Sequence, residues 1–354
     1  MNQKQFYDKL SKQAEKTRTP IRVLFELTGC CNLDCKMCYV HFLDHLQAKK
    51  EELTTKQWKA IFDDAISEGM LFATLSGGEC LLRNDFKELY LYLFERGIRI
   101  SINTNGLLLN QELIAFFVNY PPETIQISLY GTSDEEYVVA TGVPAFTLVQ
   151  KNLSLLEESN IDFKIAITPS ASSIAFTKSI IEYALQKKYR IRITQFFISP
   201  REEVSNSPSQ VSPDDICDLL EYSARLKGRS LKPIPLDSIP KAGINGETIT
   251  EKFHCTAGLN RTHVDWRGRM HPCVALPTIS CSLLDYSYSE AWKRICAEVD
   301  KLAYPDKCSS CCLKNVCKPC YAARGIEGNY SRCNEQNCEL IQKQISRGLL
   351  NFQL

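Results

Sequence analysis

"CNLDCKMC", residues 31–38, places Cys31, Cys35 and Cys38 at C-x3-C-x2-C spacing on one short stretch. Thiolates in such an arrangement bind zinc or an iron–sulfur cluster. A closed zinc site needs four ligands, and His41 is the only nearby rival for a fourth position. Three thiolates can instead hold three irons of a [4Fe–4S] cube and leave the fourth iron open to another ligand. The spacing therefore favours a cluster with one open iron.

Around this stretch, short apolar runs alternate with amphipathic segments, which is the pattern of βα units around a parallel sheet. We expect six strands, over residues 21–27, 71–75, 98–103, 124–129, 161–167 and 190–198. Six units are fewer than the eight of a closed barrel. The sequence therefore predicts an α/β fold, a partial (β/α)6 TIM-like barrel whose open side could admit a bulky substrate.

Several helix ends are also visible in the sequence. Thr54 and Gln57 can form a capping box, Asp85 precedes a helix that Gly97 ends, and Asn110 precedes another helix. A later helix is expected to begin near residue 212.

The composition changes after residue 253, because eleven of the seventeen cysteines lie between Cys255 and Cys338. Such a segment has little apolar core of its own, so bound metal is expected to hold it together. We divide the chain into an N-terminal extension (1–20), a core (21–205), a helix and linker (206–253) and a small cysteine-rich domain (254–354).

Glycines and polar residues follow three of the predicted strands, at the end where parallel α/β folds bind ligands. These stretches are Ser76-Gly77-Gly78-Glu79, Asn103-Thr104-Asn105-Gly106 and Ser128-Leu129-Tyr130-Gly131. Glycines let a backbone approach a ligand closely, and a carboxylate can accept a charge-assisted hydrogen bond from an ammonium group. We therefore expect these strand ends to share one site with the three cysteines.

Together, the cysteine loop, Met37 before its last cysteine, Tyr39 after it and the Gly-Gly-Glu motif one strand later resemble the radical S-adenosylmethionine (SAM) superfamily. The resemblance implies that the amino and carboxylate groups of SAM chelate the open iron of the cluster. It also implies that SAM is contacted by Tyr39, Gly77, Gly78, Glu79, Asn103 and Ser128. Tyr130 departs from the family's pattern, in which aspartate often stands at that position.

The C-terminal cysteines resemble a second pattern of that superfamily. Cys255 is followed by Gly268-x4-Cys273, by C-x2-C-x5-C-x2-C from Cys308 to Cys320, and by two late cysteines. This order is similar to the SPASM domain of peptide- and protein-modifying radical SAM enzymes, although its last spacing is one residue shorter than the usual C-x3-C.

This second resemblance implies two auxiliary [4Fe–4S] clusters, and hence three clusters in all. Cys255, Cys273 and Cys320 would ligate the first auxiliary cluster; Cys308, Cys311, Cys317 and a late cysteine, Cys333 or Cys338, would ligate the second. If the two late cysteines ligate one cluster each, both clusters are fully coordinated; otherwise the first keeps an open iron. A zinc ribbon is the alternative for these cysteine pairs.

Cys80 directly follows Glu79, where many members of the superfamily have proline, so we expect it near SAM. A thiol there could donate a hydrogen atom to a substrate radical, as an epimerase requires. The alternative is an inert buried thiol that packs like a small apolar side chain.

The resemblance implies an enzyme that cleaves SAM reductively to methionine and a 5′-deoxyadenosyl radical, with flavodoxin or ferredoxin as electron donor. The expected substrate is a ribosomally made peptide, modified by a thioether or carbon–carbon crosslink or by epimerisation. Only about twenty residues precede the first strand, so we expect a leader peptide to be bound by a separate leader-peptide-binding protein or by the linker. Alternatives are a sugar or aminocyclitol dehydrogenase or epimerase, a maturase of the sulfatase-activating type, and an electron carrier, which the Gly-Gly-Glu motif disfavours.

Charge and hydropathy argue against several other partners. Lysine and arginine number 42 against 41 aspartate and glutamate, so the total gives no excess of positive charge for nucleic acid. The polar N-terminus has no signal-peptide core, and no run reaches the ~18 apolar residues of a membrane span. Because the cysteines have metal-like spacings, we expect a cytoplasmic protein with clusters rather than disulfides.

Overall fold

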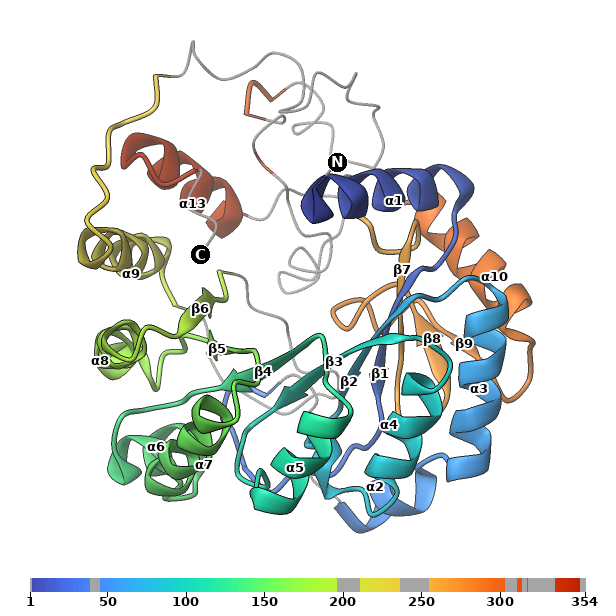
Figure 1. Cartoon of the computed structure of the whole chain (residues 1–354). Coiled ribbons are helices and arrows are strands. Elements are labelled where there is room, and N and C mark those ends of the chain that lie inside the picture. The colour runs from blue at the N-terminus through green and yellow to red at the C-terminus, as the bar shows by residue number, and fades with distance from the viewer. Residues whose placement is uncertain are drawn as a thin grey trace.

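A curved sheet with helices on its outer side is the centre of the molecule (Figure 1). The structure is a computed structural model of the chain, and it describes residues 2–38, 45–195, 211–235, 255–302, 311–313, 317 and 335–350.

Six parallel strands, paired in chain order, form the wall of the predicted partial barrel. They are β1 (Arg22–Glu26), β2 (Phe72–Ser76), β3 (Arg99–Thr104), β4 (Thr124–Ser128), β5 (Phe163–Ile167) and β6 (Arg190–Ile193). Each overlaps a stretch that the sequence predicts as a strand, so the predicted fold class is confirmed.

Side chains alternate along these strands between an apolar face and a polar one. In β3, Ile100 and Ile102 are buried, whereas Ser101 and Asn103 between and after them are half-buried. The buried set joins the main core with residues of the outer helices. The polar set faces the concave side of the barrel, which leaves that side available for ligands.

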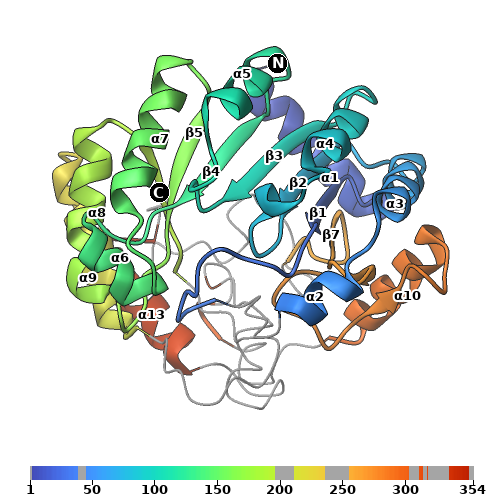
Figure 2. The ribbon, with the colours of Figure 1, turned by 90° about the horizontal axis from the view of Figure 1, so that it is seen from below.

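Helices between the strands cover the outer face of the sheet (Figures 1 and 2). They are α3 (Thr55–Ser67), α4 (Phe86–Phe94), α5 (Gln111–Asn119), α6 (Asp134–Thr141), α7 (Phe146–Glu158) and α8 (Ile174–Gln186). The short helix α2 (His45–Glu51) lies instead near the cysteine loop, where Ala48 packs with Trp266. The predicted capping box of Thr54 and Gln57 is present, and the Asn110 side chain accepts a hydrogen bond from the backbone of Leu113. Gly97 follows α4 with a φ of 75°.

The C-terminal part of the chain extends the same sheet, which the sequence analysis does not predict. β7 (Arg261–Val264) pairs in parallel with β1, and β8 (Arg269–His271) and β9 (Cys281–Ser282) follow it in antiparallel order. α10 (Tyr288–Asp300) packs beside these strands and α3. One sheet thus contains strands from before and from after residue 254. The domain boundary expected there stays a prediction.

The N-terminal extension contains a helix, α1 (Gln3–Thr17), which lies beside β7 and α10 (Figure 1). Asn2 and Gln5 form its capping box. The segment after α1 is tied to α10, because Trp292 Nε1 donates to the Arg18 carbonyl at 2.7 Å and Arg18 pairs with Asp300 at 2.5 Å.

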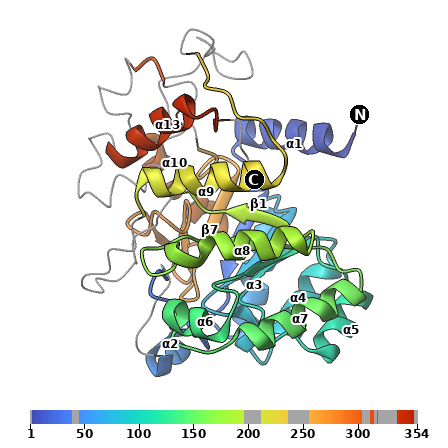
Figure 3. The same cartoon turned by 90° about the vertical axis from the view of Figure 1, so that its left-hand side faces the viewer.

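α8, α9 (Pro213–Leu226) and α13 (Glu335–Ser346) lie side by side at one edge of the barrel (Figure 3). α9 begins after Ser212, as predicted. Ion pairs join α9 to α13, with Lys343 at 2.6 Å from Asp214 and Arg347 at 2.6 Å from Asp218. Among the helices of the described residues, none has the length and apolar character needed to cross a membrane.

Candidate functional site

The loop after β1 carries the three predicted cluster cysteines at the carboxyl ends of the strands. Cys35 is buried, whereas Cys31 and Cys38 are half-buried. The Asp34 backbone N–H donates to the carbonyl of Thr141, at the end of α6, at 2.9 Å. The loop is therefore hydrogen-bonded to the end of α6.

Burial sets the protonation of these thiols. Burial is the largest cause of the raised pKa of Cys31, which is about 12. The backbone N–H of Leu33 lowers this pKa, and the Glu79 carboxylate raises it by a smaller amount than burial does. Burial and the neighbouring Cys38 also raise the pKa of Cys35. Thiols bind metal as thiolates, so metal binding at this loop would release protons.

The donor set of the loop fits a cube better than a single ion. Within the described parts of the chain, no three cysteine, histidine or acidic side chains converge as the ligands of one metal ion would. Thiolates that bind a cube each contact a different iron and need no such convergence. Donors also face the sulfurs: Asn105 Nδ2 lies 3.9 Å from Cys31 Sγ, and the Tyr130 hydroxyl hydrogen-bonds with Cys35.

Gly77 and Gly78 bring the end of β2 against the cysteine loop. The Gly78 N–H donates to the Thr28 carbonyl at 2.9 Å, and the Glu79 N–H donates to the Cys30 carbonyl at 2.8 Å. A Cβ on Gly78 would lie 2.3 Å from the Cys30 carbonyl oxygen, and one on Gly77 2.5 Å from that of Thr28. The glycines are thus required for contact between two segments of the protein, and their contact with SAM stays a prediction.

Glu79 is fully buried and accepts hydrogen bonds from two backbone N–H groups and one hydroxyl, besides a 4.0 Å contact from the Cys80 thiol. The three donors are the Asn105 N–H at 2.7 Å, the Thr104 hydroxyl at 2.9 Å and the Leu81 N–H at 3.1 Å. Burial raises its pKa to about 7, although the three donors oppose that shift. The carboxylate therefore holds the ends of β2 and β3 together, and a SAM ammonium group as a further donor stays a prediction.

Asn105 is a residue of this site that the sequence analysis did not single out. Its Nδ2 donates to Asn32 Oδ1 at 2.7 Å, inside the cysteine loop, while its backbone N–H is held by Glu79. Asn103 lines a cavity on the concave face, and its contact with SAM stays a prediction. The motif Asn103–Gly106 was visible in the sequence, but strand alternation decides which asparagine reaches the loop.

Ser128 and Tyr130 also lie beside the loop. The Tyr130 hydroxyl hydrogen-bonds with both Ser128 and Cys35. The tyrosine that departs from the family's pattern therefore contacts a predicted cluster ligand, and a SAM contact from Ser128 stays a prediction.

Arg83 fixes the entry to the loop, a role that no motif indicated. Its guanidinium donates to the carbonyls of Leu27, at 2.9 Å, and Leu53, at 3.2 Å. It also pairs with Asp85 at 2.7 Å and with Glu52 at 3.6 Å. The buried Arg83 guanidinium therefore joins the backbone before the loop, at Leu27, to the backbone after it, at Leu53.

Cys80 opens η1 (Cys80–Leu82) and is fully buried in the main core. Its Sγ lies 3.5 Å from the Asn103 carbonyl and 3.9 Å from the Leu75 carbonyl. Burial raises the pKa of this thiol well above its usual value. A hydrogen-donor role for Cys80 stays a prediction, and this environment favours the packing alternative.

The C-terminal segment also reaches the cysteine loop. Trp266, in the turn after β7, packs with Cys30 and Cys38, and a Cβ on Gly29 would lie 2.8 Å from its ring. The Trp266 carbonyl accepts from the Leu53 N–H at 3.1 Å. The side chain therefore covers the loop from the β7 side.

Some of the predicted auxiliary ligands accept N–H groups on sulfur. The Sγ atoms of Cys255 and Cys311 accept backbone N–H groups at 3.5 and 3.4 Å, and Cys317 Sγ accepts from the Asn337 side chain at 3.6 Å. Tyr39, Cys308, Cys320 and Cys333 lie outside the described residues. How the predicted auxiliary ligands, Cys273 and Cys338 among them, divide between clusters stays a prediction.

A family of known proteins matches the part of the chain that contains this site. The family model described as "Radical SAM superfamily" matches residues 25–169. The AdoMet-dependent heme synthase of Methanosarcina barkeri is 28% identical over 335 residues, covering 87% of this chain and 94% of that protein. The mycofactocin maturase MftC of Mycolicibacterium smegmatis is 29% identical over 185 residues, covering 51% of this chain and 46% of that protein.

Among solved structures, Streptococcus suis SuiB bound to its precursor peptide SuiA has the same fold. It superposes with a TM-score of 0.72 at 18% identity, and the match covers 94% of this chain and 79% of SuiB. The matched family region contains the cysteine loop, the Gly-Gly-Glu motif and strands β2 to β5. Residues 25–169 of this chain are therefore a radical SAM domain.

Proposed function

We propose that this enzyme cleaves SAM reductively at a [4Fe–4S] cluster held by Cys31, Cys35 and Cys38. The observation that carries the proposal is the loop itself: three thiols after β1, fixed to the barrel wall and faced by hydrogen-bond donors. When bound and reduced, the cluster would supply the electron that splits SAM into methionine and a 5′-deoxyadenosyl radical, which then takes a hydrogen atom from the substrate.

The protein's own residues position these groups. Glu79 fixes Asn105, which in turn orients Asn32 and faces Cys31. Hydrogen bonds to cluster sulfurs are one of the means by which proteins set the reduction potential. Arg83 and Trp266 keep the loop in place from its two sides. We expect flavodoxin or ferredoxin to be the electron donor.

A ribosomally made peptide is the first candidate substrate. The supporting observations are the fold shared with SuiB, whose structure contains a precursor peptide, and the similarity to the maturase MftC. On this proposal the product is a thioether or carbon–carbon crosslink or an epimerised residue, and a separate protein binds the leader peptide.

A small organic acid is the second candidate substrate. The heme synthase of Methanosarcina barkeri is similar to this chain over most of both lengths, whereas the similarity to MftC covers about half. The concave face of the barrel is also rich in arginine and lysine. Both observations fit a substrate that is smaller than a peptide and negatively charged.

The C-terminal cysteines are proposed to hold two further [4Fe–4S] clusters, in the manner of a SPASM domain. The N–H groups that face Cys255, Cys311 and Cys317 support this assignment.

An anaerobic assay with SAM and dithionite tests the proposed reaction. The reconstituted full chain is expected to form 5′-deoxyadenosine, measured by mass spectrometry. Candidate peptides and organic acids are then added, and a product lighter by about two hydrogens, or one that takes up deuterium from deuterated water, identifies the substrate class. Absence of 5′-deoxyadenosine from protein with a full complement of iron would contradict the proposal.

A further inference from the structure

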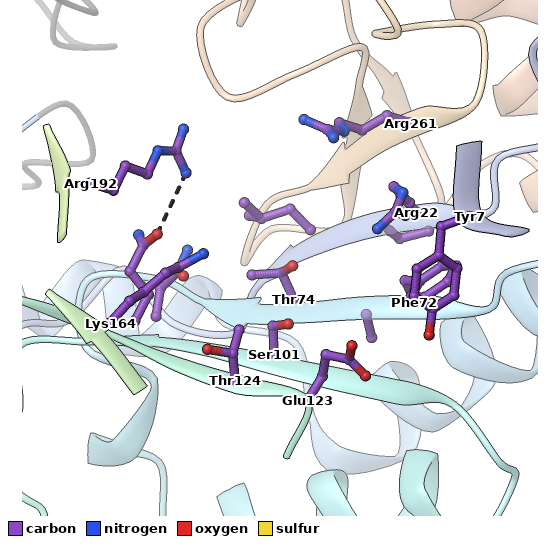
Figure 4. Close-up of a pocket in the computed structure, with 15 residues that line it drawn as sticks. Tyr7, Arg22, Phe72, Thr74, Ser101, Glu123, Thr124, Lys164, Arg192 and Arg261 are labelled. Carbon is purple, nitrogen blue, oxygen red and sulfur yellow. Dashed lines mark hydrogen bonds between the residues drawn. The ribbon is translucent and has the colours of Figure 1, made fainter. Parts of the chain in front are cut away.

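The concave face of the barrel encloses a cavity of about 360 Å³ (Figure 4). Its lining comes mostly from the amino-terminal halves of β1 to β6 and from the start of β7, and Tyr7 of α1 closes one side. The cysteine loop follows the last residue of β1, so the cavity lies toward the opposite end of the strands. Its volume is within the range of small-molecule sites, ~300–1,000 Å³.

Cations from four different strands face this cavity. They are Arg22 of β1, Lys164 of β5, Arg192 of β6 and Arg261 of β7. Figure 4 shows them around a floor of hydroxyl groups from Thr74, Ser101 and Thr124. The lining thus combines positive charge with hydrogen-bond donors.

The four cations in the lining outnumber its carboxylate, Glu123. In the part of the chain that the structure describes, none of the four cations forms an ion pair with a carboxylate. Glu123 is the acid in the lining, and it already pairs with Arg99. Arg192 Nη1 donates to the neutral Gln126 side chain at 3.5 Å.

The cations also repel one another across the cavity. Burial, followed by repulsion from Arg261, lowers the pKa of Arg22, and burial, followed by repulsion from Arg192, lowers that of Lys164. An anion between the cations would offset this repulsion. It would also compensate the cations for the hydration that burial removes.

We propose that this cavity binds carboxylate groups of the substrate through Arg22, Lys164, Arg192 and Arg261. The assignment of the anion to the substrate rests on the proposed function, whereas the anion site itself does not. Arginine pairs with carboxylates through two parallel N–H groups, and lysine contributes a point charge. The carboxylates belong to a small polyacid or to acidic side chains of a peptide, which present the same chemistry.

Calorimetric titration of the reconstituted, SAM-loaded full chain tests the site. The probes are tricarballylate and an amidated hexaglutamate peptide, with the triamide and hexaglutamine as uncharged controls. For a probe that binds, the affinity is expected to fall about tenfold in Arg192→Gln or Arg261→Gln, because each substitution removes one charge-assisted hydrogen bond. Both side chains belong to exposed residues, so their replacement removes charge without removing core packing.

Arg190→Gln is the matched control. Arg190 lies on the same strand as Arg192, but it is outside the cavity lining and pairs with Asp162 at 2.5 Å. The control is expected to bind the probes as the wild type does. Circular dichroism confirms the fold of each variant, and either Arg192→Gln or Arg261→Gln suffices for the test.

Tighter binding of tricarballylate assigns the site to a small polyacid, and tighter binding of hexaglutamate assigns it to an acidic peptide. The anion site is overturned if neither probe binds at millimolar concentration, or if the cavity variants bind as the Arg190→Gln control does. 5′-Deoxyadenosine formation without probes is measured on the same proteins. Wild type that binds the probes but does not cleave SAM would overturn the proposed function and leave the anion site intact.

Discussion

Glu79 is a fully buried carboxylate with donors from Leu81, Thr104 and Asn105 around it. Burial raises its pKa from 4.5 to about 7 in the folded protein. The folded state therefore binds this proton more tightly than the unfolded state does. The stability that the protonated group contributes is complete below pH 4.5 and is lost as the pH rises through about 7.

Glu79→Gln should remove this pH dependence. As the pH rises from 5 to 8, the wild type is expected to lose up to about 3 kcal/mol of unfolding free energy relative to the variant, because the buried carboxyl group gives up its proton in this range. Urea midpoints of the reduced, cluster-free protein measure the difference. Glu112→Gln, at an exposed site on α5, is the control. A gap between wild type and Glu79→Gln that is the same at both pH values would contradict the assigned environment.

The residues of the Gly-Gly-Glu motif also show where prediction from sequence stops. Their place after the second strand, beside the cysteine loop, could be predicted from strand order alone. Their partners could not, because hydrogen bonds to Thr28, Cys30 and Asn105 depend on how closely two strand ends approach. Arg83 had no sequence signal for the same reason, since its partners are mostly backbone carbonyls.

At the scale of elements, the docking of the β2 end against the cysteine loop depends on Gly78. A methyl group there would lie 2.3 Å from a backbone oxygen, which cannot move away as a flexible side chain could. Gly78→Ala is expected to lower iron binding at the loop and to destabilise the protein by roughly 2 kcal/mol or more.

Iron content and the thermal midpoint of Gly78→Ala measure this effect. Gly228→Ala is the control, because no atom lies within 4 Å of the would-be Cβ of Gly228, which has a positive φ of 65°. Gly228→Ala is expected to lower the free energy of unfolding by only about 1 kcal/mol, because alanine is strained at a positive φ. Equal iron content and equal midpoints in the two variants would contradict the packing described for Gly78.

The six barrel strands could be predicted because apolar side chains alternate or run together in each of them. β7 could not, because Arg261, Thr262 and His263 are polar, and its pairing with β1 depends on contacts more than two hundred residues apart in sequence. α1 was missed because its composition is polar, although the Asn2 and Gln5 capping box marks its start.

For the whole molecule, the cysteine count predicts three cubes. Anaerobically reconstituted protein is expected to carry roughly twelve irons, by the stoichiometry of cubane clusters. Iron, sulfide and zinc analysis of one preparation measures this. Saturation near four irons together with stoichiometric zinc would contradict the auxiliary clusters and favour a zinc ribbon.

The central claim is that SAM is cleaved at the loop after β1, and one comparison tests it most directly. Replacement of Cys31, Cys35 and Cys38 by alanine should abolish 5′-deoxyadenosine formation with dithionite while the absorbance of the auxiliary clusters remains. Cys30→Ala, in the same loop but outside the C-x3-C-x2-C set, should retain the activity. Undiminished 5′-deoxyadenosine formation by the triple variant would contradict the account.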